Sequence, residues 1–215
     1  MVTVAIFMEG GELPHANQPA MTFNNSARLR QSMHELLLQV FDEEKFDLQV
    51  RIGGGEKSAK NLFIKALEEH KESILLIDVY KDATKADKLK RLGIEEKADQ
   101  VFFMEREMEA WIISQCACIE ACAELENWTR EKASQPLEED KNLAGKDIAK
   151  IPQPSNVLKI ILGRYYSTIK KNKKVKQKYG KLKHAPTMIE HLNLPQLKQD
   201  FTEVGRLLDY ISNKQ

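Results

Sequence analysis

The octapeptide SILLIDVY, residues 73–80, decides the fold class of this chain. Its first five residues are almost all apolar, and a single aspartate, Asp78, interrupts the run. A continuous apolar run of this length predicts a strand that is buried on both faces, as strands are in parallel sheets covered by helices. Residues 2–8 (VTVAIFM) form a second such run, and Glu9, Gly10 and Gly11 follow it. The two runs predict neighbouring interior strands.

Strand-like and helix-like patterns alternate along the first 125 residues. Strands are predicted at residues 2–8, 46–52, 73–80 and 101–104, and helices at 26–41, 59–67, 85–92 and 107–125. This alternation predicts an α/β fold with a mainly parallel, doubly wound sheet and helices on both sides. The pattern leaves open whether the second strand is antiparallel.

The remaining 90 residues are predicted to add a helical extension to this core. Residues 126–156 carry Pro136, Gly145, Pro152 and Pro154 and predict an irregular linker. In residues 157–215, helices are predicted at 157–169, 187–192 and 196–211, and a basic loop at 172–183. The last helix carries an apolar stripe, so we expect the extension to pack back on the α/β core, residues 1–125.

Composition and charge narrow the class of protein. Of 215 residues, 30% are charged and 42% are hydrophobic, which is ordinary for a folded protein. The net charge of +1 does not point to any particular class of partner. The N-terminal run is too short for a signal sequence, and no apolar run approaches the roughly 20 residues that span a bilayer. We therefore expect a cytoplasmic protein without a membrane partner. The three cysteines, Cys116, Cys118 and Cys122, are expected to be buried core residues.

Acidic residues follow three of the predicted strands. Glu9 follows the first strand, Asp78 ends the third, and Glu105, Glu107 and Glu109 come after the fourth. Because ligands of open α/β sheets bind outside the carboxyl ends of the strands, these carboxylates are candidates for a Mg²⁺ or Mn²⁺ site. The alternative is that Glu107 and Glu109 only favour the first turn of a helix, where acids interact well with the helix dipole. That alternative does not explain Asp78.

Five segments in this order resemble domain-of-unknown-function family 4276: VAIFMEGG, GGGEKSAK, LLIDVY, FMEREMEAWI and KYGKLKHAPTMIEHL. The resemblance implies a Toprim-like fold, the phosphoryl-transfer fold of topoisomerases, primases and several nucleases. It further implies a neighbouring ABC-type or OLD-type ATPase as partner and a role in anti-phage defence. Glu9 matches the Toprim glutamate. Asp78 matches only the first half of the D-x-D motif, because Tyr80 stands where the second aspartate belongs, so Asp82, Glu107 or Glu109 is expected to supply the missing ligand.

Two further motifs suggest contact with phosphate. Gly53, Gly54 and Gly55 form either a phosphate-binding loop or a strand-to-helix turn that needs a positive φ angle. The basic stretch is a candidate nucleic-acid-binding surface, with Tyr165, Tyr166 and Tyr179 interleaved. Its candidate binding residues are Lys170, Lys171, Lys173, Lys174, Lys176, Lys181, Lys183 and Tyr179. Lys178 is the predicted catalytic lysine, although Lys181 and Lys183 are close enough in sequence to take that role. His184 is expected to be structural or exposed.

These features predict a Mg²⁺- or Mn²⁺-dependent nuclease that acts on DNA or RNA. Its catalytic residues are expected to be Glu9, Asp78, Glu107, Glu109 and Lys178, with Glu9, Asp78, Asp82, Glu107 and Glu109 as metal ligands. The alternative is a catalytically degenerate regulatory or scaffolding subunit of the ATPase, which the tyrosine at position 80 favours. The sequence leaves open the oligomeric state, including a homo-oligomer.

Overall fold

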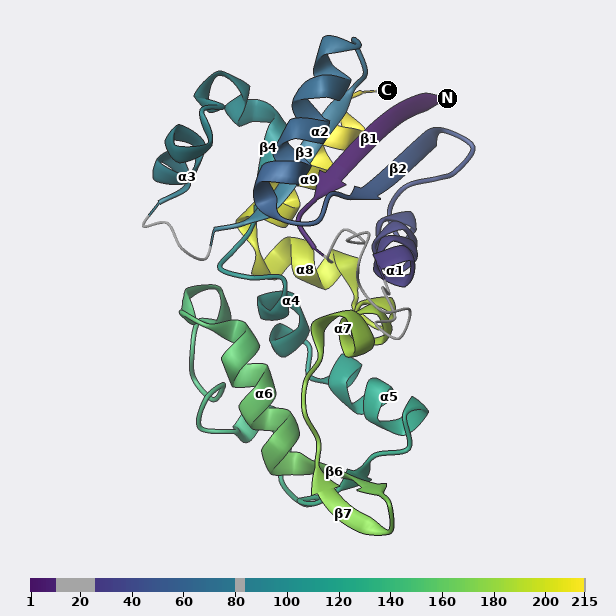
Figure 1. Ribbon diagram of the computed structural model, residues 1–215, viewed down its shortest axis with the longest axis vertical. Helices are drawn as coiled ribbons and strands as arrows, with labels where there is room; N and C mark the ends of the chain where they lie inside the picture. Colours follow the sequence, from purple (N-terminus) through teal and green to yellow (C-terminus); the bar gives the residue numbers. More distant parts are fainter. Residues whose placement is uncertain (11–25, 80–83, 215) are drawn as a thin grey trace.

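The computed structural model describes residues 1–10, 26–79 and 84–214. Its larger sheet has four strands and lies in the upper half of the view in Figure 1. The strands are β1 (Val2–Met8), β2 (Phe46–Ile52), β3 (Ser73–Asp78) and β4 (Val101–Met104). Their order is β2-β1-β3-β4, and all three pairings are parallel. The predicted α/β class and mainly parallel sheet are therefore confirmed, and the second strand is parallel.

The sheet has a buried core on each face because alternate residues of each strand point to opposite sides. On one face, Ala5 and Phe7 of β1 pack with helix α2 (Glu56–Glu68) and helix α3 (Lys85–Leu92). On the other face, Ile6 and Met8 pack with α1 (Ser26–Leu38) and with the C-terminal helix α9 (Thr202–Ser212). A short 3₁₀ turn, η1 (Glu95–Gln100), leads into β4. Helices thus flank both faces, as the apolar strands require.

The segment after β4 differs from the single helix predicted for residues 107–125. It consists of α4 (Glu109–Ser114) and α5 (Ala117–Leu125), separated at Gln115. The Gln115 side chain bridges to the backbone of Asn193, accepting from its N–H at 2.7 Å and donating to its carbonyl oxygen at 3.0 Å. This contact, 78 residues away in sequence, accompanies the break. All three cysteines are buried and free, as expected, and burial raises the pKa of Cys116 and Cys122 to about 12.

Residues 126–176 contain a second, antiparallel sheet that the sequence patterns did not predict. It is formed by β5 (Thr129–Arg130), β6 (Tyr166–Lys170) and β7 (Lys173–Lys176). The turns η2 (Leu137–Glu139) and η3 (Ile148–Lys150) precede helix α6 (Pro154–Tyr165). The helix predicted for residues 157–169 is therefore wrong after Tyr165, where the chain becomes extended. Of the predicted basic loop at 172–183, residues 173–176 are strand and residues 181–183 begin α7.

The C-terminal helices close the core on the α1 side. They are α7 (Lys181–Glu190), α8 (Leu194–Asp200) and α9, in place of the two helices predicted for 187–192 and 196–211. Arg28 of α1 donates to Thr187 Oγ1 of α7 at 2.7 Å and pairs with Glu190 at 3.2 Å. One continuous buried cluster runs from Val4 to Ile211, so it includes residues on both sides of the predicted boundaries at 125 and 157. In the described ranges, no helix is long and apolar enough to span a membrane.

Candidate functional site

The carboxyl ends of β1, β3 and β4 bring acidic residues to one edge of the central sheet. Glu9 follows β1 directly, Asp78 is the last residue of β3, and Glu109 begins α4 just after β4. Asp78 lies beside Met104 in the β3–β4 register. Because the three strands are parallel, their carboxyl ends share this edge, as the sequence predicted. We call Glu9, Asp78, Glu107 and Glu109 the acidic cluster.

A lysine from the C-terminal part of the chain lies among these acids. The Nζ atom of Lys181, in the first turn of α7, is 3.8 Å from Asp78 Oδ2 and 3.7 Å from Glu109 Oε2. Burial opposes the charge of Lys181, but Asp78, Glu109 and Glu9 outweigh it and hold the pKa of Lys181 above its ordinary value. The ammonium group is therefore charged at neutral pH and neutralises part of the acidic cluster.

Asp78 is the most strongly perturbed acid of the cluster. Its Oδ1 atom accepts a hydrogen bond from the backbone N–H of Met108 at 3.2 Å. Burial raises the pKa of Asp78 to about 7, Lys181 opposes the rise, and Glu9 and Glu109 add to it. A carboxyl group with this pKa exchanges a proton readily at neutral pH, which is a property of catalytic acids and bases.

Glu9 connects the rest of the acidic cluster to a second group of charges, which includes Lys88 and Glu56. Burial raises the pKa of Glu9 above its usual range, while Lys88 of α3 opposes that rise. Lys88 is itself buried and pairs with Glu56 Oε2 at 2.5 Å. Within the described part of the chain, the Oε2 atom of Glu9 is buried and has no hydrogen-bond partner. A buried carboxylate oxygen without a donor is costly and marks a position where a ligand or cation would be stabilised.

The glutamates after β4 are held by residues from distant segments. The Tyr179 hydroxyl donates to Glu109 Oε1 at 3.0 Å, and the backbone N–H of Ser155 donates to Glu107 Oε2 at 2.8 Å. Burial raises the pKa of Tyr179 well above its ordinary value, so its hydroxyl stays protonated. Tyr179 therefore orients Glu109. Its predicted role in nucleic-acid binding stays a prediction.

The start of α7 determines which lysine reaches the acids. The backbone N–H of Gly180 donates to Nδ1 of His184 at 2.9 Å, and the His184 ring packs edge-on against Trp128. Burial lowers the pKa of His184 to about 4, so the ring is neutral and structural, as expected. These contacts fix the turn before Lys181. The predicted catalytic lysine, Lys178, has an exposed side chain, and the structure favours Lys181 in its place.

The other predicted binding residues lie away from the acidic cluster. Lys170, Lys171, Lys173, Lys174 and Lys176 are exposed on β6, β7 and the turn between them. Lys183 pairs with Glu126 at 3.6 Å. Tyr165 and Tyr166 are core residues, fully buried, so they are not available for base stacking. Asp82, a predicted metal ligand, and Tyr80 lie outside the described residues.

The glycines after β2 form a strand-to-helix turn. Gly54 has φ +77°, and its carbonyl oxygen accepts from the Gly10 N–H at 2.8 Å. A Cβ atom at Gly53 would lie 2.5 Å from the Cα atom of Ala59, so the close approach of α2 requires glycine there. These constraints account for Gly53 and Gly54. A phosphate-binding role for this loop, including Gly55, stays a prediction.

One charged group near the cluster was not singled out from the sequence. Glu56, in the first turn of α2, pairs with Lys88 and with Arg91 at 2.6 Å. Hydrogen bonding from Arg91 lowers the pKa of Glu56 to about 2, so this carboxylate stays ionised. The available signal was the spacing of Lys88 and Arg91, three residues apart on one face of a helix.

The cluster supplies the type of donor atom that a hard divalent cation prefers, but its side chains are arranged around a lysine. As they stand, no three Asp, Glu, His or Cys side chains among the described residues form a group that could hold a metal ion. The donors present are nevertheless carboxylate oxygens, which Mg²⁺ and Mn²⁺ prefer, and Glu9 Oε2 lacks a partner within the described ranges. The residues that would hold an ion are Glu9, Asp78 and Glu109, which Lys181 now partly neutralises.

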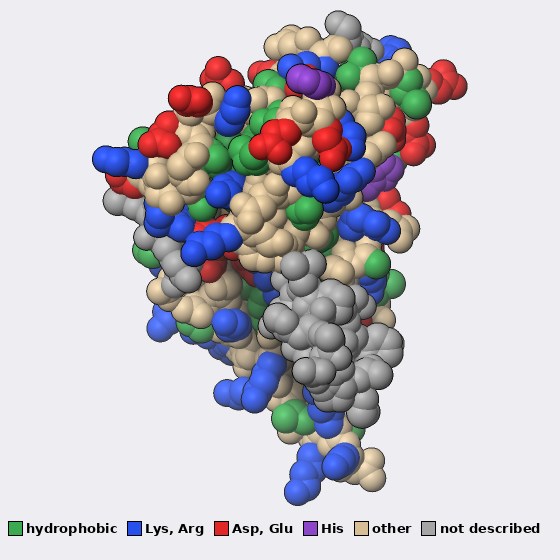
Figure 2. Space-filling model, turned by 45° about the horizontal axis from the view of Figure 1, so that its top comes forward, with side chains coloured by type: hydrophobic (Ala, Val, Ile, Leu, Met, Phe, Trp, Pro, Cys, Tyr) green, Lys and Arg blue, Asp and Glu red, His purple; other side chains and the backbone are tan. Residues whose placement is uncertain are grey.

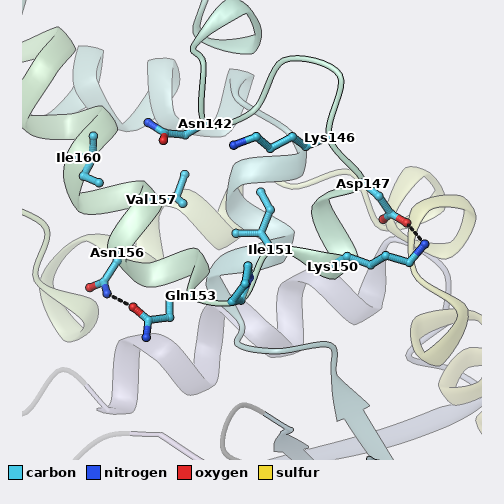
Figure 3. A pocket seen from close by; sticks show the side chains of 10 residues that line it. Asn142, Lys146, Asp147, Lys150, Ile151, Gln153, Asn156, Val157 and Ile160 are labelled. Carbon is cyan, nitrogen blue, oxygen red and sulfur yellow. Dashed lines mark hydrogen bonds and ion pairs between the residues drawn. The ribbon is translucent and has the colours of Figure 1, made fainter. Parts of the chain in front are cut away.

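A surface pocket of about 510 Å³ lies between η3 and α6 (Figure 3). Its apolar side includes Ile151, Val157 and Ile160. Most of its polar side chains are already bonded: Asn156 bonds to Gln153, Lys150 pairs with Asp147 at 2.8 Å, and Asn142 donates to Asp140 at 2.8 Å. They offer few free groups to a ligand, so the acidic cluster is the stronger candidate site.

Fold and site together define an α/β protein with a parallel sheet and a carboxylate–lysine cluster at the carboxyl edge of that sheet. Comparison with protein families then identifies the particular group: the chain belongs to the family described as Domain of unknown function (DUF4276), which matches residues 11–212. The family resemblance seen in the sequence is thereby confirmed. Neither a curated protein nor a solved structure matches the chain significantly.

Proposed function

We propose that this protein is a Toprim-like, Mg²⁺- or Mn²⁺-dependent nuclease that hydrolyses phosphodiester bonds of a nucleic acid. The observation that carries the proposal is the meeting of Glu9, Asp78 and Glu109 around the Lys181 ammonium at the carboxyl edge of the sheet. The raised pKa of Asp78, about 7, supports the proposal because proton-transfer groups commonly have a pKa near neutral pH.

The side chains gathered around Lys181 each have a role in this proposal. Glu9, Asp78 and Glu109 would hold the ion, and Tyr179 orients Glu109 through its hydroxyl group. When bound, the ion would polarise a phosphoryl oxygen and promote the ionisation of water. Lys181 supplies positive charge for the phosphate, and this charge stabilises the more negative transition state. An ionised Asp78 carboxylate that is not bound to the ion would accept a proton.

The family resemblance extends the proposal to a partner. An ABC-type or OLD-type ATPase encoded nearby would restrain or trigger the nuclease, in the setting of anti-phage defence. This partnership is tested by measuring cleavage with and without the ATPase.

The direct test is cleavage by the purified full chain. Plasmid, single-stranded DNA and total RNA are incubated with Mg²⁺, Mn²⁺ or EDTA. We expect metal-dependent cleavage that Glu9→Gln and Asp78→Asn each abolish, with circular dichroism confirming that both variants are folded. The matched control is Glu96→Gln, an exposed glutamate on η1, which should cleave like the wild type. Cleavage that persists in both site variants means that another group does the chemistry.

One observation favours a second candidate function, a non-enzymatic subunit of the ATPase. Lys181 lies where a cation would neutralise the acids, and a permanent ammonium makes an ion unnecessary. Calorimetry separates the candidates. A nuclease site binds Mn²⁺ in the wild type and loses this binding in Asp78→Asn, whereas a degenerate site shows no binding in either protein.

A further inference from the structure

The hairpin formed by β6 and β7 is the most basic projection of the described structure. It lies at the end of the molecule remote from the parallel sheet (Figure 1). Its two-residue turn, Lys171 and Asn172, has φ angles of +49° and +59°, the left-handed conformation that tight hairpins use. The ladder continues past β7, because the Gln177 N–H donates to the Tyr166 carbonyl oxygen at 2.9 Å. The hairpin is therefore a two-stranded ribbon with a fixed hydrogen-bond register.

The charges on this ribbon repel one another. Lys170 is directly opposite Lys173 in the register, and Lys171 lies between them in the turn. Like charges directly opposite each other destabilise an antiparallel pair. No Asp or Glu occurs from residue 151 to 189, so the hairpin has no acidic residue of its own. Lys174 forms an ion pair with Glu131, which lies just after β5. Figure 2 shows Lys and Arg side chains at the corresponding lower tip of the molecule. A polyanion would relieve this repulsion.

The lysines lie on both faces of the ribbon. Side chains of a strand alternate between faces, and directly opposed residues share a face. Lys170 and Lys173 therefore share one face, and Lys174 and Lys176 share the other. Two apolar side chains, Ile169 and Val175, are also exposed on the ribbon, at 71% and 38%. A partner with negative charge on both sides of the ribbon fits this pattern.

The ribbon is joined directly to the acidic cluster. Residues 177–180 lead from β7 to Lys181, and Gln177 and His184 are buried side by side at the base of the hairpin. Five residues span at most about 17 Å, so Lys176 lies within about half a helical turn of B-form DNA from Lys181. A nucleic acid held by the ribbon is thus within reach of the carboxylates.

We propose that the β6–β7 hairpin is a docking element for double-stranded DNA and makes duplex DNA the substrate class of this protein. The major groove of B-form DNA, about 12 Å wide, admits a two-stranded ribbon, and the phosphates on its two sides face the lysines of the two faces. The deep and narrow major groove of an RNA duplex does not admit it. The assignment of duplex DNA as substrate rests on the proposed nuclease function, whereas DNA binding by the hairpin does not.

The test is a binding measurement on the full chain in EDTA, where metal-dependent cleavage does not occur. Fluorescence anisotropy compares one short sequence as duplex DNA, as single-stranded DNA and as duplex RNA, at several salt concentrations. The hairpin variant combines Lys170→Gln, Lys173→Gln, Lys174→Gln and Lys176→Gln. The charge-matched control combines Lys57→Gln, Lys65→Gln, Lys90→Gln and Lys97→Gln, four exposed lysines outside the hairpin. Circular dichroism checks the fold of both variants.

We expect the wild type and the control to prefer duplex DNA and the hairpin variant to bind it at least about tenfold more weakly. The slope of log K against log salt should fall by about 3–4, because each lost phosphate contact contributes about 0.9. An unchanged affinity in the hairpin variant, an equal loss in the control, or equally tight binding of single strands or duplex RNA overturns the proposal. Hairpin-dependent binding without any cleavage in Mg²⁺ instead refutes the nuclease function alone.

Discussion

Replacing Asp78 with asparagine should make the protein more stable above neutral pH. Asparagine has nearly the same shape, and its oxygen can still accept the Met108 N–H bond. Asp78 is buried, and burial raises its pKa from 3.8 to about 7. The folded protein must therefore hold a charge that it disfavours at pH 8, and the variant does not. The variant loses one contact, that with the partly exposed Lys181 at 3.8 Å.

The sign and the size follow from proton linkage. Because the pKa of Asp78 is higher in the folded chain than in the unfolded chain, its proton stabilises the fold fully below about pH 4. This stabilisation is lost as the pH rises to about 7 and stays lost above it. The full cost of ionising Asp78 is of the order of 4 kcal/mol. Between pH 5 and pH 8 the variant should gain about 2–3 kcal/mol relative to the wild type.

The measurement is urea unfolding of both proteins in EDTA, at half-unit steps from pH 5 to pH 8. The difference in the free energy of unfolding should grow in favour of Asp78→Asn and level off above pH 7. Asp99→Asn, at an exposed aspartate, is the control and should show no such trend. A difference that is the same at pH 5 and pH 8 would refute the claim that Asp78 is held as a desolvated acid.

Three further predictions test the surroundings of the site. Gly53→Ala should lower the free energy of unfolding by about 1–3 kcal/mol in chemical denaturation, because the added Cβ atom meets the α2 backbone. The control is Gly55→Ala, which has open space around it and should change the free energy of unfolding by less than about 0.5 kcal/mol. Glu203→Gln should lower the free energy of unfolding by about 1–2 kcal/mol, because the buried Glu203 accepts the Phe103 N–H of β4 and pairs with Lys85 and Arg206, which are partly exposed. An unchanged Tm in a thermal melt would contradict this anchoring role. Mn²⁺ should raise the Tm of Lys181→Met more than that of the wild type, because the variant lacks the ammonium group that competes with the ion. Equal shifts in Tm would argue against the acids as ligands.

The central sheet could be predicted because its strands are defined by their own residues. The run at 101–104 is apolar throughout and that at 2–8 is apolar except for Thr3, as expected for strands buried on both faces, and the bounds of β1 and β4 match the prediction. The antiparallel sheet was missed because β7 reads Lys-Lys-Val-Lys and is exposed along its length, so it has no apolar periodicity. Its pairing comes from the backbone and a tight turn. The break between α4 and α5 was missed because it accompanies a contact with Asn193, far away in sequence.

The acids of the site could be predicted, and their cation could not. Parallel strands place their carboxyl ends together, so the meeting of Glu9, Asp78 and Glu109 follows from strand order alone. The choice between Lys178 and Lys181 depends on where α7 begins and on its contact with α1, and neither is encoded in the basic stretch itself. The contact of Tyr179 with Glu109 could not be predicted for the same reason: only the tertiary structure shows that its hydroxyl bonds to Glu109.

The burial of β1 against α9 has a consequence for synthesis on the ribosome. Residues at the two ends of the chain share one apolar cluster, so the first strand emerges long before the helix that covers it. Until α9 has left the exit tunnel, the apolar side chains that it covers on this face of the sheet lack that part of their cover. A nascent chain that lacks α9 therefore carries an incomplete apolar core, and an activity of the proposed kind would begin only once α9 has been made and has packed on the sheet.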